Sequence, residues 1–137
     1  MSYLLDTNVV SETIRRQQTK AVIGWLRQLP AEALFVSVLT LGELRKGIER
    51  LADKKGKETL RLWLEHELPA WFNGRVQPVN LAVAERWGRL LADMGRPVPA
   101  IDSLLAATAL HYELRLVTRN TGEFDYPGLE VINPWQM

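Results

Sequence analysis

The sequence predicts an α/β fold with a central parallel sheet of about five short strands. Short apolar runs alternate with longer segments of helical period, which is the pattern of parallel strands joined by helices. The chain has 137 residues, 47% hydrophobic and 24% charged, enough apolar surface for a well-packed core. No internal repeat, linker or low-complexity tract divides it, so we expect a single domain over residues 1–137.

The first expected strand lies at the N-terminus. Residues 3–5 are a short apolar run that ends at Asp6, as a buried strand would. Residues 11–16 and 21–28 have helical periodicity, and Pro30 ends the second of these segments. The sequence therefore predicts a strand followed by a pair of helices.

A second strand and two helices are expected next. Residues 34–38 form an apolar run, and residues 41–51 carry apolar side chains spaced three, four and three apart, which predicts an amphipathic helix. Residues 54–56 are charged and end in glycine, the composition of a turn. Residues 59–72 have one apolar stripe and predict another helix, which Pro69 should kink or end.

The C-terminal half continues this alternation. A strand at residues 75–79 leads to a helix that Asn80 caps and Gly95 closes. After a stiff loop at residues 97–102, residues 103–112 predict a helix with few polar side chains, buried on most sides. The set of strands is completed by two short ones at residues 115–118 and 130–132.

The composition excludes several kinds of function. There is no cysteine, so disulfide scaffolds, thiolate zinc sites, iron–sulfur clusters and cysteine nucleophiles are ruled out. A net charge of +1 argues against binding to nucleic acid or membrane through bulk positive charge. The N-terminus does not read as a signal peptide, and no apolar stretch approaches the about 20 residues of a membrane span, so we expect a soluble, cytoplasmic protein.

Three carboxylates lie at the boundaries of expected elements. Asp6 and Glu43 follow the first two strands, and Asp102 precedes the most apolar helix. Each fits an ordinary structural role: Asp6 and Asp102 as helix N-caps, and Glu43 with Thr40 in a capping box. The alternative is that one edge of the sheet gathers all three, since ligands bind at the carboxyl ends of parallel strands.

Converging carboxylates of this kind would form a site for a hard cation. Like charges held close together resist ionisation unless a cation neutralises them. Oxygen ligands without cysteine or a histidine pair suit Mg²⁺ or Mn²⁺. Such an ion lowers the pKa of bound water and neutralises charge at a phosphate, so the pattern points to metal-assisted phosphodiester hydrolysis.

Five sequence blocks span essentially the whole chain. They are Leu4-Leu-Asp-Thr-Asn-Val-Val-Ser-Glu12, Thr40-Leu-Gly-Glu-Leu-Arg-Lys-Gly47, Ile101-Asp-Ser-Leu-Leu-Ala-Ala-Thr-Ala109, Leu116-Val-Thr-Arg-Asn-Thr-Gly-Glu-Phe124 and Val131-Ile-Asn-Pro-Trp135. In this order and spacing they resemble the PIN-domain ribonucleases of the VapC and FitB toxin type. The resemblance implies a three-layer α/β/α fold, a divalent-metal site, endonucleolytic cleavage of RNA, homodimers and neutralisation by a cognate antitoxin.

Three residues match the main acidic positions of that family: Asp6, Glu43 and Asp102. By this resemblance we expect one Mg²⁺ site, with Mn²⁺ as the alternative ion. Asp6 and Asp102 would be the nearest ligands, and Glu43 would help directly or through water.

The fourth position of the family motif departs from the usual pattern. Members often have an aspartate where this chain has Asn120. Asn120 would then hold a metal-bound water or orient a neighbouring carboxylate, while Glu123 or Asp125 supplies the missing charge from the same loop. We therefore expect one metal site rather than two.

A basic segment lies between residues 45 and 61. Its seven Lys and Arg residues against three acids give it a charge of +4, which leaves −3 for the rest of the chain. Two pairs at helical spacing, Lys46 with Arg50 and Glu49 with Asp53, are like-charged, so a plain solvated helix face explains the segment poorly. We expect it to contact RNA phosphates.

Five tryptophans are many for a chain of this length. Trp25 and Trp87 fit the apolar stripes of their helices. Trp63, Trp71 and Phe72 either pack in the core or line a groove for a partner helix.

These observations favour a Mg²⁺-dependent endoribonuclease that acts as the toxin of a toxin–antitoxin pair. The alternative from another class is a catalytically inactive RNA-binding α/β module, whose acids cap helices and whose basic segment only holds RNA. An aspartyl phosphotransferase with Asp6 as nucleophile is disfavoured, because the second acid expected two residues later is Asn8.

Overall fold

Five short parallel strands form the centre of the fold. The structure is a computed structural model that describes all residues from 1 to 137. The strands are β1 (Tyr3–Leu5), β2 (Leu34–Ser37), β3 (Val76–Gln77), β4 (Arg115–Val117) and β5 (Val131–Ile132). Their order is β3-β2-β1-β4-β5, and every neighbouring pair is parallel. The predicted five-stranded parallel sheet is confirmed.

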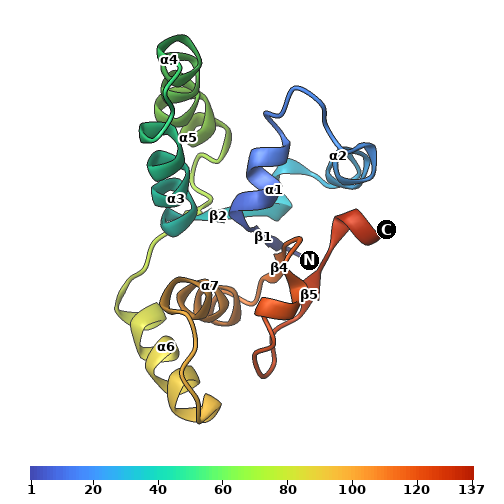
Figure 1. The fold of residues 1–137 in the computed structure, drawn as a ribbon. Coiled ribbons are helices and arrows are strands. Elements are labelled where there is room, and N and C mark those ends of the chain that lie inside the picture. The colour runs from blue at the N-terminus through green and yellow to red at the C-terminus, as the bar shows by residue number, and fades with distance from the viewer.

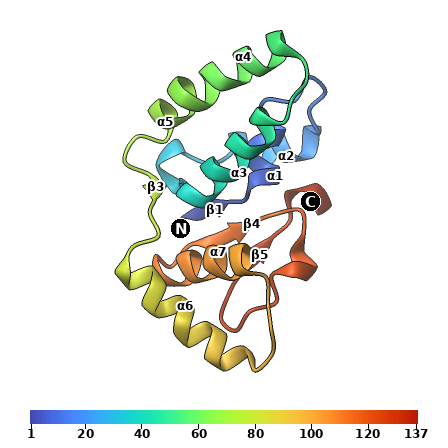
Figure 2. The ribbon, with the colours of Figure 1, turned by 60° about the vertical axis from the view of Figure 1, so that its left-hand side comes forward.

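Two groups of helices cover opposite faces of the sheet and make three layers (Figure 1). Figure 2 shows the sheet between the two groups. The first group is α1 (Thr7–Glu12), α2 (Lys20–Arg27), α3 (Val38–Glu49), α4 (Lys54–Leu62) and α5 (Leu68–Trp71). The second is α6 (Leu81–Met94) and α7 (Ala100–His111). The three-layer α/β/α arrangement is therefore confirmed. None of these helices combines the length and the apolar character that crossing a membrane requires.

The two cores follow from the alternation of side chains along the central strands. On β1, Tyr3 and Leu5 belong to the core under the first group of helices, whereas Leu4 belongs to the core under α6 and α7. On β4, Val117 and Leu116 divide in the same way. Because successive residues of a strand face opposite sides, even three-residue strands stabilise both layers.

Two tryptophans pack as the helical stripes predict. The ring of Trp25 meets the ring of Tyr3 edge-on, with 5.3 Å between centroids, and it packs against the first core. Trp87 packs against the second core, and its indole N–H donates to the hydroxyl of Ser103 at 2.8 Å. Both side chains therefore contribute to packing of the two cores.

The prediction of a helix at residues 11–16 is wrong. Helix α1 begins at Thr7 and ends at Glu12, and a loop follows it. The Glu12 side chain, 2% exposed, accepts a hydrogen bond from the backbone N–H of Thr19 at 2.8 Å and pairs with Arg15 at 3.0 Å. The helix thus ends at Glu12, whose side chain binds polar groups of the loop that follows.

Capping side chains start α3 and α4 earlier than the apolar periodicity indicates. The hydroxyl of Ser37 accepts from the backbone N–H of Leu39 at 3.0 Å, so α3 begins three residues before the predicted start. The predicted turn at residues 54–56 is wrong, because the Asp53 carboxylate accepts from two backbone N–H groups there and starts α4.

A π-helical turn, Trp63–Glu67, connects α4 to α5. Its mark is a hydrogen bond from the backbone N–H of Leu68 to the carbonyl of Trp63, five residues back. Pro69 follows the π turn directly at the start of α5, and the helix ends at Trp71. The helix predicted over residues 59–72 is thus confirmed in outline, but with a widened turn before the proline.

The remaining elements fall close to the predicted ones. Asn80 caps α6 by accepting from the backbone N–H of Val83 at 3.0 Å, and Gly95 ends it at φ 66°, in the left-handed region. Helix α7 begins at Ala100, three residues before the predicted start. Strand β3 has only two residues, so the prediction of a strand over residues 75–79 is too long.

Candidate active site

The carboxyl ends of β1 and β4 lie side by side at the centre of the sheet. From β1 the chain continues to β2 and β3 on one side, and it then crosses to β4 and β5 on the other. The order reverses between β1 and β4, which is where open α/β sheets bind ligands. Leu5 pairs with Val117 in the register, so Asp6 and Thr118 are the first residues beyond the two strands.

Asp6 accepts a hydrogen bond on each carboxylate oxygen. Oδ1 accepts from the backbone N–H of Thr7, and Oδ2 accepts from the hydroxyl of Thr118, both at 2.8 Å. The first bond makes Asp6 the N-cap of α1, so the capping interpretation is confirmed. Only 8% of the residue is exposed. The carboxylate is thus held in one orientation at the reversal point of the sheet.

Thr118 is the site residue that the sequence interpretation missed. Besides donating to Asp6, its Oγ1 accepts from the side-chain amide of Asn8 at 3.3 Å and from the backbone N–H of Asn120 at 3.1 Å. One donated and two accepted bonds exhaust the capacity of a hydroxyl group. The signal was its place at the end of an apolar strand, which parallel pairing brings level with Asp6.

Glu43 reaches the site from the middle of α3. The predicted capping box is wrong, because α3 begins at Val38 and both Thr40 and Glu43 lie inside the helix. Instead, Oε1 of Glu43 accepts from the hydroxyl of Thr7 at 2.6 Å. Thr7 therefore contacts Asp6 through its backbone and Glu43 through its side chain.

Asp102 lies in the first turn of α7 and not at its N-cap, which is Pro99. The N-cap interpretation of Asp102 is therefore wrong. Partial burial raises the pKa of Asp102, and the negative charges of Glu123, Asp6 and Glu43 raise it further. The sheet edge does bring these carboxylates near one another.

The loop after β4 supplies a fourth carboxylate, Glu123. Its charge raises the pKa of both Asp6 and Asp102, whereas Asp125 is not among the causes for either. Of the two acids of this loop, Glu123 is therefore the one whose charge acts on the site. Asn120 contributes its backbone N–H to Thr118, and its side chain is exposed.

Burial is the main reason that the pKa of Asp6 is raised above its usual value of 3.8. The charges of Glu43 and Glu123 raise it further, while the hydrogen bonds from Thr118 and Thr7 lower it. The charges that neighbouring side chains contribute here are all negative. A cation at this point would relieve both the burial cost and the repulsion.

The donor set fits a hard divalent ion in its chemistry. The candidate ligands are carboxylate oxygens, without sulfur or imidazole, as Mg²⁺ and Mn²⁺ prefer. In the arrangement seen, no group of three or more His, Asp or Glu side chains has the geometry to hold a metal ion. Binding one would require these side chains to draw closer together.

Comparison with known proteins identifies the family. A family model described as "PIN domain" matches residues 3–128. "Toxin FitB" of Neisseria gonorrhoeae is 37% identical over 135 residues, covering 96% of this chain and 97% of the relative. The chain belongs to the PIN-domain family. This PIN domain is also 33% identical over 136 residues to "VapC ribonuclease Y4jK" of Sinorhizobium fredii, covering 97% of each.

Solved structures share the fold over nearly the whole chain. The crystal structure of FitAcB from Neisseria gonorrhoeae matches with a TM-score of 0.91 and 36% identity, covering 98% of this chain and 99% of that one. VapBC-5 from Mycobacterium tuberculosis, described as a member of the VapBC family of toxin–antitoxin systems, matches with a TM-score of 0.64 and 25% identity, covering 96% and 98%.

This PIN domain also carries an apolar groove of about 550 Å³. One wall comes from α1 and α2, including Ile23 and Leu26, and the other from the π-helical turn and α5. Trp63, Trp71 and Phe72 all line it. Phe72 is 3% exposed and belongs to the core, as core packing predicts, whereas Trp71 is 50% exposed in the groove.

Proposed function

We propose that this PIN domain is a Mg²⁺-dependent endoribonuclease and the toxin of a toxin–antitoxin pair. The observation that carries the proposal is the fixed Asp6 carboxylate at the reversal point of the sheet, with the charges of Glu43, Asp102 and Glu123 nearby. The names of two relatives, a VapC ribonuclease and a FitB toxin, support the activity and the biological role. The proposed substrate is RNA in the cytoplasm.

Asp6 and Asp102 are the proposed metal ligands, and Glu43 assists directly or through water. Mg²⁺ is the proposed ion, with Mn²⁺ as the substitute. Glu123 is the better candidate than Asp125 for the fourth carboxylate, because its charge acts on both Asp6 and Asp102. Asn120 is proposed as a neutral catalytic residue that orients a carboxylate or a water.

The protein's own part in hydrolysis is to hold negative oxygens in fixed positions. Lewis-acid activation of water and neutralisation of charge at the phosphate are the chemistry that such an ion supplies. Thr118 and Thr7 orient the carboxylate of Asp6 by donating to its two oxygens. The Thr7 hydroxyl orients Glu43 in turn. These contacts fix the orientation of Asp6 and Glu43, which limits the reorganisation needed when the carboxylates draw together around an ion.

Cleavage assays with matched variants test the proposal. Purified protein is incubated with single-stranded and structured RNA, with Mg²⁺, with Mn²⁺ and with EDTA. We expect cleavage that EDTA abolishes and added Mg²⁺ restores. Asp6→Asn and Asp102→Asn should lower the rate by about 100-fold or more, whereas Asp125→Asn, which removes the same charge from the loop beside the site, should cleave normally.

Two outcomes would overturn this assignment. Metal-independent cleavage, or full activity in Asp6→Asn and Asp102→Asn, would place the chemistry elsewhere. RNA binding without cleavage under every metal condition would favour the inactive RNA-binding module instead.

The proposed antitoxin contact is the apolar groove between α2 and α5. Its walls are mainly apolar, while Arg27 and Glu67 add charge to the lining, a combination that suits the apolar face of an amphipathic helix. The membership of VapBC-5 in a family of toxin–antitoxin systems supports such a partner. Trp71→Glu should weaken antitoxin binding without changing cleavage by the free toxin.

We also propose that the chain forms a homodimer, as the family resemblance implies. Sedimentation analysis of the purified protein tests it, and a monomer at all concentrations would contradict it.

A further inference from the structure

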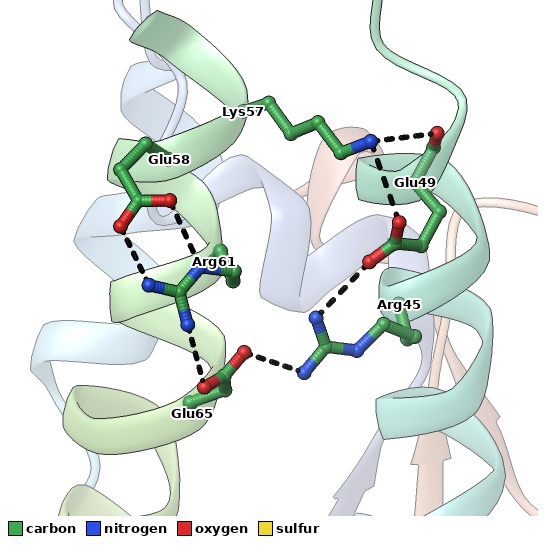
Figure 3. Close-up of polar contacts among 6 residues, drawn as sticks. All are labelled: Arg45, Glu49, Lys57, Glu58, Arg61 and Glu65. Carbon is green, nitrogen blue, oxygen red and sulfur yellow. Dashed lines mark hydrogen bonds and ion pairs between the residues drawn. The ribbon is translucent and has the colours of Figure 1, made fainter. Parts of the chain in front are cut away.

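Three of the seven basic residues of the segment take part in ion pairs that join α3 to the helix that follows it (Figure 3). Arg45 pairs with Glu65 at 2.9 Å, and the network extends through Glu49 to Lys57 and through Arg61 to Glu58. With three cations and three anions, it has no net charge. The prediction that ion pairing explains this segment poorly is therefore wrong for these residues.

The remaining cations of the segment carry most of its positive charge. They make no ion pair and are exposed to solvent, and they are Lys46, Arg50, Lys54 and Lys55. The one other acid of the segment, Asp53, is engaged in capping α4. Phosphate contact can thus be assigned to particular residues rather than to the whole segment.

Two of these cations lie on the same face of α3 as Glu43. The spacings from Glu43 to Lys46 and from Lys46 to Arg50 are three and four residues, which places all three in one row along the helix. At 1.5 Å per residue, Lys46 and Arg50 lie about 4.5 and 10.5 Å along the axis from Glu43. The row therefore leads directly away from the candidate active site.

Two glycines widen this row. Gly42 and Gly47 lie beside Lys46 on the exposed side of α3, and a Cβ atom at either position would meet nothing within 4 Å. Glycine inside a helix is less favourable than alanine. Because the space beside Gly42 and Gly47 is open, packing does not require glycine at either position. A helix surface without side chains between basic residues lets a ligand backbone approach closely.

We propose that this face of α3 binds the phosphate backbone of the RNA strand as it enters the candidate active site. The face consists of Gly42, Lys46, Gly47 and Arg50, and Lys54 and Lys55 follow it in the chain at the start of α4. The inference rests on the proposed function, because Glu43 marks the end of the row where the cleaved phosphate would lie. Backbone contacts of this kind position a strand without reading its sequence.

Binding measurements in the Asp6→Asn background test the basic residues without interference from cleavage. The probe is a short single-stranded RNA of mixed sequence, titrated at several salt concentrations. Lys46→Gln with Arg50→Gln should weaken binding about tenfold at low salt and reduce the salt slope by about 0.7 per lost phosphate contact. The control, Lys20→Gln with Arg89→Gln, removes the same charge from exposed positions on α2 and α6. It should change the RNA affinity and the salt slope only by the small amount that losing two distant positive charges causes.

An equal loss in the control pair would show that bulk charge, and not this face, holds RNA. Unchanged RNA binding in Lys46→Gln with Arg50→Gln would overturn the proposal. If those substitutions weakened binding of an acidic protein partner but not of RNA, the face would belong to a protein interface instead.

The glycines allow a test that misfolding does not imitate. Gly42→Ala with Gly47→Ala should raise the Tm, because alanine favours the helix and its methyl group meets open space. The same variant should bind RNA more weakly, because two methyl groups now stand between the strand and the helix backbone. A raised Tm with unchanged RNA affinity would remove the glycines from the proposal.

Failure of this inference and failure of the proposed function give different results. A protein that cleaves RNA normally while Lys46→Gln with Arg50→Gln leaves KM and binding unchanged retains its function but lacks this binding face. A protein that never cleaves RNA but still loses affinity in that variant has the face without the activity.

Discussion

The hydroxyl of Thr118 donates a 2.8 Å hydrogen bond to Oδ2 of Asp6, joining residues 112 positions apart in the chain. The contact forms because β1 and β4 are paired in parallel and end level with each other. It opposes the effect of burial on Asp6, since a hydrogen bond to the carboxylate stabilises the charged form. Thr118 is thus a positioning residue for the candidate active site.

Thr118→Val should raise the pKa of Asp6 and destabilise the fold. Valine has nearly the shape of threonine but leaves Oδ2, the Asn8 amide and the Asn120 N–H without their partner, which costs about 1–3 kcal/mol. The pH profile of cleavage should move to higher pH, because the Asp6 carboxyl group then loses its proton at a higher pH. Thr118→Ser, which keeps the hydroxyl, should restore the profile, and a profile unmoved in Thr118→Val would contradict the role.

Asp102→Asn should stabilise the metal-free protein. The folded state raises the pKa of Asp102 above 3.8, so it binds the proton more readily than the unfolded chain does. Ionisation near neutral pH therefore opposes folding, and stability should increase as the pH falls toward 3.8. Since Asp102 is partly exposed, the gain should be below about 1 kcal/mol.

Thermal unfolding with and without Mg²⁺ measures this effect. Mg²⁺ should raise the Tm of the parent protein and lose most of that effect in Asp102→Asn. Equal stabilisation by Mg²⁺ in both proteins would exclude Asp102 as a ligand, whatever happens to cleavage.

Glu12→Gln should have the opposite effect on stability. The hydrogen bonds from Thr19 and Arg15 outweigh the effect of burial and lower the pKa of Glu12 below 4.5. Its contribution is therefore present above pH 4.5 and disappears as the pH falls through the lowered value. We expect a loss of about 1–2 kcal/mol near neutral pH that shrinks in acid. Urea unfolding of Glu12→Gln and the parent protein, at neutral pH and in acid below the lowered pKa, checks this. A loss of stability that does not depend on pH would contradict it.

Arg75→Lys should destabilise the edge of the sheet near β3. The guanidinium donates to the backbone carbonyls of Ala31, Leu34 and Trp71, and it lies 5.0 Å from the centroid of the Trp71 ring. A lysine keeps the charge but cannot reach three carbonyls with one planar group. We expect a loss of about 1–3 kcal/mol in urea unfolding. Arg89→Lys on exposed α6 is the matched control, and equal losses in the two variants would contradict the account.

The sequence predicts this fold well where apolar runs decide the structure. Strand β1 is apolar at three successive residues, Tyr3, Leu4 and Leu5, which predicts a strand buried on both faces, as the structure shows. Helix starts are predicted less well, because Ser37 and Asp53 act through single side-chain hydrogen bonds that periodicity does not register. Local capping chemistry therefore decides where α3 and α4 begin.

The candidate site is predicted in part. Asp6, Glu43 and Asp102 act on one another through their charges, as the sequence predicts, although Glu43 lies inside α3 and not at its start. Thr118 was missed because its role depends on strand pairing between the two ends of the chain. The preference for Glu123 over Asp125 likewise depends on which acid of a short loop acts on Asp6 and Asp102 in the folded chain. Neither fact is local in sequence.

The π-helical turn before Pro69 constrains the number of residues in this segment of the chain. A π turn is an α-helix that contains one additional residue. Deleting one residue between Trp63 and Glu67 would restore regular α geometry and rotate everything after it by about 100°. Phe72 would leave the core, Trp71 would leave the groove, and Arg75 would lose its carbonyl partners. Proteins that share this groove should therefore accept substitutions in the segment more readily than any change in its number of residues.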